Sequence, residues 1–342
     1  MVNPARHNVA GETKGLTMRL RPFGTALLVA ALIGALTPPA AQAQTPYPNQ
    51  TIKIIVPNPP GGLPDTLSRI VGKRLQERVG EPVIVENRAG ANSGLGTAAM
   101  TQAPADGYTL MMADGAILSI SPLLYAKLPY NPKDVLPVSM VARAPLFLAI
   151  NPNVPAKNLK ELIDYAKANP GKLNYGSIGI GSFHHLSMEA FNAAFGLQMN
   201  HIPYKGSSET IGAILGGHID ILFAAYAGLR PAAESKKVAI LASNGPKRSP
   251  QAPDVPAIAE LSPGFDLAVI QGITTRVGAP RAAVEKIAAE MAEIVKEPEI
   301  ISQFNTAGIE PIGAGPEEYR AALNAEAERM AKIAEKAGLK AQ

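Results

Sequence analysis

Short apolar runs alternate with longer amphipathic segments along most of the chain. The first three runs are TIKIIV (51–56), PVIVE (82–86) and YTLMMA (108–113). Between the first two, apolar residues recur at helical spacing from Leu67 to Leu75, and Gly80 closes the segment. Apolar runs of strand length separated by amphipathic helices are typical of parallel, doubly wound sheets.

The same alternation starts again near residue 147. This second series predicts strands at 147–150, 173–176, 200–203, 219–223 and 238–242, and helices at 158–168, 184–195 and 208–215. Two helical segments, 281–296 and 316–336, end the chain without strands of their own, so we expect them to pack on the first series. Two extended segments, 141–152 and 265–280, then cross between the series.

These patterns predict an α/β fold of two lobes. Each lobe is a doubly wound, mainly parallel sheet, and two crossover strands form a hinge beside a cleft. Lobe 1 is predicted to be discontinuous, with residues 44–145 and 270–342, and lobe 2 to hold residues 146–269.

Residues 1–43 have the pattern of a secretory signal. Basic residues precede an apolar run (23–36), and Ala41-Gln42-Ala43 provides a small-x-small cleavage site. The run has about 14 residues, whereas a membrane-spanning helix needs roughly 20, so cleavage after Ala43 is favoured over a membrane anchor. Either Met1 or Met18 can be the true start, and Met18 begins the more typical signal. We therefore expect export to the periplasm.

Composition and motifs argue against several classes of function. The chain has a net charge of +4. The predicted signal carries most of this surplus, so neither a nucleic-acid partner nor a basic patch is expected. The chain has no cysteine and neither a P-loop nor a GxSxG motif. The adjacent His184 and His185 have no third ligand at metal-site spacing. We expect neither catalysis nor a metal or other cofactor.

Several loops follow predicted strands, which is where open α/β sheets bind ligands. Two of them are rich in glycine and open helices, whose N-termini favour anions. Asp65 is more readily interpreted as a helix cap than as a ligand contact. For Lys205, a solvated surface position and a ligand contact are about equally favoured. The predicted ligand-binding set is Pro60, Gly61, Gly62, Leu63, Asp65, Asp114, Ser177, Gly179, Gly181, Ser182, Phe183, His184, Lys205, Ala224, Ala225 and Tyr226.

A family resemblance covers almost the whole chain after the predicted signal. The motifs that carry it are PPGG (59–62) with Asp65, ENRAGA (86–91), ADGYTL (105–110), LPY (128–130), PGKLNYGS (170–177), IPYKGS (202–207), LGGHID (215–220) and KRSP (247–250). In this order they resemble the Bug/TctC solute receptors of tripartite tricarboxylate transporters.

The resemblance implies a Venus-flytrap fold of the type II kind, which closes around a small organic anion. It also implies that membrane subunits of a tripartite tricarboxylate-type transporter are the partners, and monomer is the default state. The chain departs from the family at two places: Asn58-Pro59-Pro60 replaces the frequent Phe-Pro-Ala, and Ala224-Ala225-Tyr226 replaces a frequent Asp or Asn. Without that acidic group an ammonium has no obvious partner. We therefore hypothesise a carboxylate with an apolar or aromatic body. A sensory subunit, or a periplasmic enzyme on the same scaffold, is the alternative.

Overall fold

The computed structural model describes residue 15 and residues 46–339. The predicted signal and its cleavage site therefore lie outside the described residues, apart from Gly15. The chain from Tyr47 onward forms one compact unit. None of the helices in the described residues is both long and apolar enough to cross a membrane.

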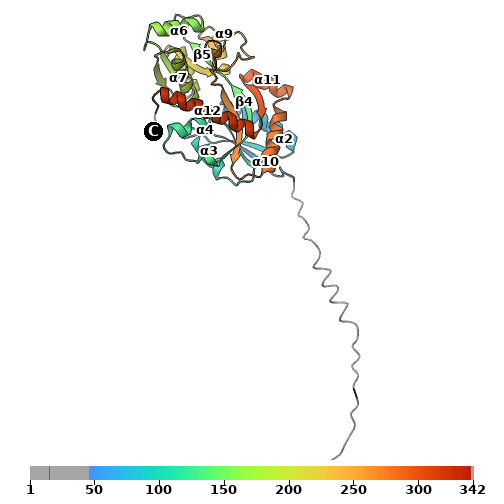
Figure 1. Ribbon diagram of the computed structural model, residues 1–342. Coiled ribbons are helices and arrows are strands. Elements are labelled where there is room, and N and C mark those ends of the chain that lie inside the picture. The colour runs from blue at the N-terminus through green and yellow to red at the C-terminus, as the bar shows by residue number, and fades with distance from the viewer. Residues whose placement is uncertain (1–14, 16–45, 340–342) are drawn as a thin grey trace, which may run out of the picture. The chain divides into compact units, whose positions relative to one another are not determined.

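Two β-sheets, with helices packed on them, organise residues 46–339 (Figure 1). Sheet 1 has six strands in the order β11-β4-β10-β3-β1-β2. These strands are β1 (Ile52–Val56), β2 (Val83–Asn87), β3 (Thr109–Asp114), β4 (Val135–Ala144), β10 (Val269–Arg276) and β11 (Glu310–Ala314). Their helices are α2 (Leu63–Val79), α3 (Gly94–Gln102), α4 (Ala116–Ser119), α5 (Ser121–Leu124), α10 (Arg281–Ile294), α11 (Pro298–Ala307) and α12 (Pro316–Lys336). We call this set lobe 1.

Sheet 2 has five strands among the described residues, in the order β7-β6-β8-β5-β9. They are β5 (Leu146–Ile150), β6 (Asn174–Ser177), β7 (Asn200–Pro203), β8 (Ile221–Ala225) and β9 (Ala239–Ser243). With α6 (Leu159–Ala168), α7 (Phe183–Phe195), α8 (Ser207–Leu215) and α9 (Tyr226–Glu234) they form lobe 2. Short 3-10 turns lie at Pro132–Asp134 and Ile258–Glu260. The α/β, two-lobed prediction is confirmed, and the residue boundaries of the lobes stay a prediction.

The prediction of mainly parallel sheets is confirmed, and each sheet also contains one or more strands that run the opposite way. Strands β1, β2 and β3 pair in parallel, as do β6, β7 and β8. The strands that arrive from the other lobe pair antiparallel: β5 beside β8 and β9, and β10 beside β3 and β4. The reason is geometric. A crossover leaves one sheet at the carboxyl edge of its parallel strands and enters the next sheet at the equivalent edge, so it must run the opposite way.

The C-terminal segment differs from the prediction. The sequence pattern gave it two helices and no strand, whereas β11 pairs antiparallel with the edge of β4. Its sequence, EPIGA, contains proline and glycine, and a register shift interrupts the pairing, so it lacks a strand signal. Helix α12 was expected on lobe 1 alone. It contacts β4 and α4 in lobe 1 and α7 in lobe 2 (Figure 1).

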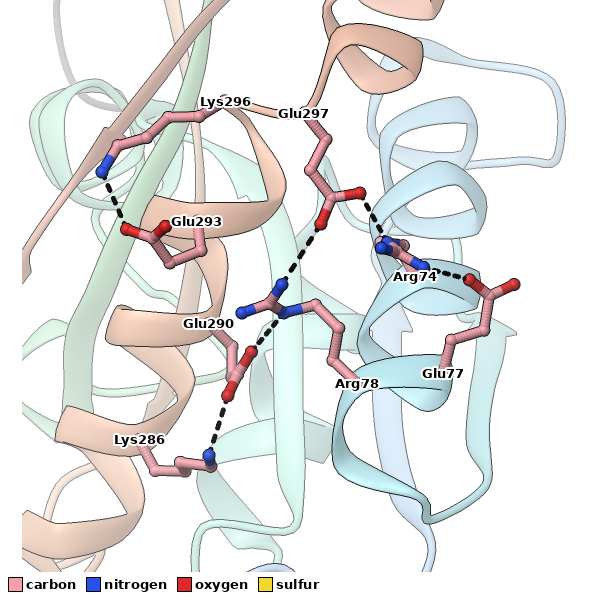
Figure 2. Close-up of polar contacts among 8 residues, drawn as sticks. All are labelled: Arg74, Glu77, Arg78, Lys286, Glu290, Glu293, Lys296 and Glu297. Carbon is pink, nitrogen blue, oxygen red and sulfur yellow. Dashed lines mark hydrogen bonds and ion pairs between the residues drawn. The ribbon is translucent and has the colours of Figure 1, made fainter.

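Packing and ion pairs hold the helices of lobe 1 to its sheet. Ile54, Leu67 and Ile287 belong to one buried apolar cluster. At the surface of lobe 1, ion pairs connect α2 to α10 and to the start of α11. Arg78 Nε lies 2.5 Å from Glu290 Oε2, and Arg74 Nε lies 2.5 Å from Glu297 Oε2 (Figure 2). The remaining pairs of this network are Arg74–Glu77, Arg78–Glu297, Lys286–Glu290 and Lys296–Glu293 (Figure 2).

Asn244 joins the two crossovers. It is fully buried, its Oδ1 accepts the N–H of Leu146 at 2.8 Å, and its Nδ2 donates to the carbonyl of Leu267 at 2.8 Å and to Ser187 Oγ at 3.1 Å. Arg143 Nη2 and Asp266 Oδ2, one from each crossover, lie 2.8 Å apart. These bonds tie the two crossovers to each other, where the sequence predicts the hinge.

Candidate functional site

The loops at the carboxyl ends of the parallel strands meet where the two lobes touch. A Cβ atom added to Gly181, in the loop after β6, would lie 2.2 Å from Leu124 Cδ1 of α5. On another flank, Gln251 Nε2 donates to the carbonyl of Ile309 at 3.2 Å, and Gly308 lies against Tyr226. We call the loops after β1, β3, β6 and β8 the interlobe loops. They hold most of the predicted ligand-binding residues.

The buried side chain of Asp65 holds the first interlobe loop in place through hydrogen bonds. Its side chain is 4% exposed, and its Oδ2 accepts the N–H of Gly61 at 2.9 Å. Its oxygens also accept Arg69 and the Nδ2 of Asn87, which in turn donates to the carbonyl of Asn58. Burial opposes the charge of Asp65, but these donors lower its pKa below the ordinary value. Both oxygens are thus occupied by protein donors, which fits a positioning role.

Helix α2 begins earlier than expected and without a side-chain cap. It starts at Leu63, its N-cap is Gly62, and neither Asp65 nor Thr66 caps it, so the predicted cap is wrong. Within residues 46–339, no partner accepts a hydrogen bond from the N–H of Gly62 or Leu63. Pro60, Gly61 and Gly62 are exposed, and Leu63 is half-buried. Because α2 has 17 residues, its N-terminus presents donors and a positive dipole end that suit an anion.

The lobe 2 loop after β6 is held in shape by its own side chains. Ser177 Oγ accepts the N–H of Gly179 at 3.1 Å, and His185 Nδ1 accepts the N–H of Gly181 at 3.0 Å. Ser182 caps α7 by accepting the N–H of His185 at 3.3 Å. Ser177, Gly179, Gly181 and Ser182 therefore lie together as predicted, but the amides of the two glycines are used internally. Phe183 and His184, the first two residues of α7, have no acceptor for their N–H among residues 46–339.

A stack of three rings supports this loop. His185 and His201 stack with ring centroids 4.0 Å apart, and Tyr175 stacks on His201 at 4.9 Å. His201 Nε2 lies 2.7 Å from Ser177 Oγ. Burial lowers the pKa of both histidines to about 4, so both rings are neutral at neutral pH. The sequence analysis missed His201 and left His185 unassigned, because only the tertiary structure brings them together.

His184 is placed differently from His185. Its side chain is half-buried, and its Nδ1 is buried without a hydrogen-bond partner among the described residues. Burial lowers the pKa of His184 to about 4, so the imidazole is uncharged at neutral pH. An uncharged ring at the N-terminus of α7 can offer one hydrogen bond without attracting or repelling charge.

Other predicted residues fall on both sides of the interlobe surface. Ala224 is 4% exposed and packs in the lobe 2 core, and Phe183 is 5% exposed in a buried cluster, so their contact with a ligand stays a prediction. Ala225 is exposed at the end of β8. Tyr226 opens α9, and its ring packs 4.9 Å from that of Phe147. Lys205 is exposed, and among residues 46–339 its side chain forms no ion pair or hydrogen bond.

Asp114 ends β3 at the same edge as the first loop. Its Oδ1 accepts the N–H of Ala116 at 3.1 Å, and burial raises its pKa to about 6. Behind it lies Glu326 of α12, which is 1% exposed. No pattern in the sequence marks Glu326, because it occupies an ordinary position in a helix rich in Ala, Glu and Lys.

The comparisons with known proteins identify the family. The family model described as "Tripartite tricarboxylate transporter family receptor" (TctC) matches residues 67–339. The chain belongs to this family. BugT of Bordetella pertussis is 34% identical over 86% of this chain and 91% of its own length.

Solved structures place the fold in the same family. An R. palustris protein, Rpa4515, determined with adipate, is 29% identical and superposes with a TM-score of 0.79 over 86% of this chain and 100% of its own. A structure described as that of a periplasmic transporter is 33% identical, with a TM-score of 0.77 over 86% of this chain and 99% of its own. TctC proteins are receptors rather than enzymes, with the two-lobed fold of periplasmic solute-binding proteins.

Proposed function

We propose that this TctC receptor binds a small carboxylate with an apolar body between its lobes and delivers it to the membrane subunits of a tripartite tricarboxylate-type transporter. The observation that carries the proposal is the pairing of two helix N-termini. Those of α2 in lobe 1 and α7 in lobe 2 both follow carboxyl-end loops, and both have amide donors without a protein acceptor in residues 46–339. An anion that accepts from both would hold the lobes together.

The surrounding side chains support the ligand class. Ala225, exposed at the end of β8, offers no acidic group to pair with an ammonium, and His184 is uncharged. Neither residue favours an amino acid over a simple carboxylate. The relative Rpa4515, solved with adipate, offers a model ligand: two carboxylates joined by an apolar chain. We therefore expect aliphatic diacids such as adipate, or aromatic acids of similar length, to bind better than glutamate or aspartate.

A binding screen tests the ligand class. The chain from Gln44 is mixed with adipate, benzoate-type acids, citrate, glutamate, aspartate and nicotinate, and its thermal unfolding is followed. A ligand specific for the folded state raises the melting temperature with its concentration. A shift by adipate or an aromatic acid, confirmed by calorimetry, supports the proposal. A larger shift by glutamate or aspartate would contradict the proposed ligand class, and no shift with any acid would contradict the receptor chemistry.

Export and delivery need separate tests. The full chain, expressed in a Gram-negative host, should appear in the periplasmic fraction with Gln44 as its first residue, which mass spectrometry of the intact protein reads directly. Delivery is tested by uptake of labelled ligand into cells that hold the membrane subunits, with and without the receptor. Uptake that does not depend on the receptor would favour a sensory role.

A further inference from the structure

Two carboxyl groups meet behind the interlobe loops, one from β3 and one from α12. Glu326 is 1% exposed, and its Oε1 accepts Ser119 Oγ at 2.6 Å. A Cβ atom added to Gly115 would lie 2.2 Å from the same oxygen, so only glycine fits there. Gly115 directly follows Asp114, which places the Glu326 carboxyl group beside the turn that follows Asp114 at the carboxyl end of β3.

The two carboxyl groups receive few hydrogen bonds from the protein, although the Nε donors of Arg143 and Arg329 are buried without a partner among the described residues. Among residues 46–339, Asp114 receives one hydrogen bond, from the N–H of Ala116, and Glu326 receives one, from Ser119. Gln271 of β10 stands directly opposite Asp114, is 1% exposed, and has a buried Oε1 with no donor. Side chains directly opposite on paired strands lie on the same face of the sheet. A proton on Asp114 would provide the donor that this Oε1 lacks.

The charges that face Glu326 do not balance the pair. Asp114 disfavours the ionised form of Glu326, and the buried Tyr319 carries no positive charge that could stabilise it. Arg143 and Arg329 favour the ionised form, but their effect is smaller than that of burial. Arg143 is already paired with Asp266. Burial, followed by the repulsion from Asp114, raises the pKa of Glu326 to about 8, and burial raises that of Asp114 to about 6. Near neutral pH the pair therefore holds about one proton.

We propose that Asp114 and Glu326 act together as a proton-accepting pair, and that binding of an anion between the lobes takes up a second proton. This inference rests on the proposed function. An incoming carboxylate adds negative charge near Asp114, which favours its protonated form. The proton cancels a repulsion that would otherwise exclude the ligand and gives Gln271 its donor. Asp114 contacts the ligand side, whereas Glu326 is a positioning residue that acts through Asp114 and Gly115.

Linkage fixes the sign of the pH dependence. If binding takes up a proton, affinity falls as pH rises above the pKa of Asp114, by up to about tenfold per pH unit. Acids such as adipate are already ionised in this range, so the ligand itself contributes little to the slope. Asp114→Asn removes the titrating group and should flatten the profile. Glu326→Gln replaces a carboxyl group that is already protonated near pH 7 by a neutral amide, so it should leave the midpoint of the profile near the pKa of Asp114.

Calorimetry of adipate binding at pH 7, in phosphate and in Tris, measures the number of protons exchanged, because these buffers differ in heat of ionisation. We expect uptake of about one proton for the wild-type receptor and close to none for Asp114→Asn. Glu328→Gln, an exposed neighbour on α12, is the matched control and should retain the wild-type uptake. Tight adipate binding without proton uptake would overturn the inference and leave the proposed function standing.

The pH dependence of stability tests, without any ligand, whether Glu326 keeps a proton in the folded state. Because the folded pKa of Glu326 lies above its unfolded value, the stability that depends on its proton is lost as pH rises toward 8. Glu326→Gln should therefore gain stability relative to the wild type between pH 5.5 and pH 8.5, measured by urea unfolding. A difference that does not change with pH refutes the shared proton. A failure of adipate to bind would instead count against the proposed ligand class.

Discussion

Replacing Gly181 with alanine tests whether the contact between the interlobe loops controls closure. Gly181 has a φ of +77°, and its added Cβ would lie 2.2 Å from Leu124 Cδ1 across the lobe boundary. Leu124 is 6% exposed within a buried cluster, so its side chain has little room to turn away. Alanine should therefore be tolerated when the lobes separate and should clash when they approach as they do here.

The expected magnitude has two parts. The left-handed backbone costs about 1 kcal/mol for alanine in any lobe arrangement, so it lowers stability without changing closure. The clash acts only with the lobes together, and overpacking of this kind costs about 1–3 kcal/mol. Since 1.4 kcal/mol corresponds to a tenfold change in affinity, Gly181→Ala should weaken ligand binding roughly 5- to 150-fold.

Titration calorimetry of the best acid from the screen measures this loss. Gly171→Ala is the matched control, because Gly171 has a φ of +73° and nothing within 4 Å of an added Cβ. It should lose similar stability and keep wild-type affinity. Leu124→Ala combined with Gly181→Ala should recover part of the affinity that Gly181→Ala alone loses, because it removes the side chain that the new Cβ meets. If Gly181→Ala bound its ligand as tightly as Gly171→Ala, the closing contact would be refuted.

Three further perturbations test the scaffold. Glu290→Gln should lower the unfolding free energy by about 1 kcal/mol in urea, because Glu290 is buried and pairs with both Arg78 and Lys286. Glu293→Gln, at an exposed pair, should leave the unfolding free energy nearly unchanged, and equal losses would show that burial does not decide the value of these pairs. The pKa of His185 is about 4 in the folded state against an ordinary 6.5, so roughly 3 kcal/mol of stability should be fully present above pH 6.5 and lost as pH falls through 4. His185→Asn should therefore make the unfolding free energy in urea depend less on pH in this range. An unchanged slope in the variant would contradict the prediction. Asn244→Ala leaves the buried N–H of Leu146 and the carbonyl of Leu267 without their hydrogen-bond partner, and should lower the unfolding free energy by at least about 2 kcal/mol. An unchanged melting curve would mean that the crossovers do not depend on this side chain.

Local pattern was sufficient for most of the elements. Helix α12 begins and ends where its periodicity predicts, at Pro316 and Lys336, and β7 has its predicted bounds. Apolar period and capping residues are local properties, so they can be read from neighbours in the chain. The same holds for the interlobe loops, because the carboxyl ends of parallel strands share one edge and glycine marks where a backbone turns. β11 was missed because its pairing with β4 creates a strand from a segment with no strand pattern.

The chemistry of the individual site residues depended on the tertiary structure. From the sequence, Asp65 could be a cap or a ligand contact; three donors from separate segments make it the support of a loop. Ala224 lies near the carboxyl end of a predicted strand, as a ligand contact would, but its side chain is buried in the lobe 2 core. Glu326 had no signal, since its burial against Gly115 and Ser119 joins positions about two hundred residues apart. A side chain's pKa, exposure and partners depend on what folding brings beside it, and neither spacing nor composition records that.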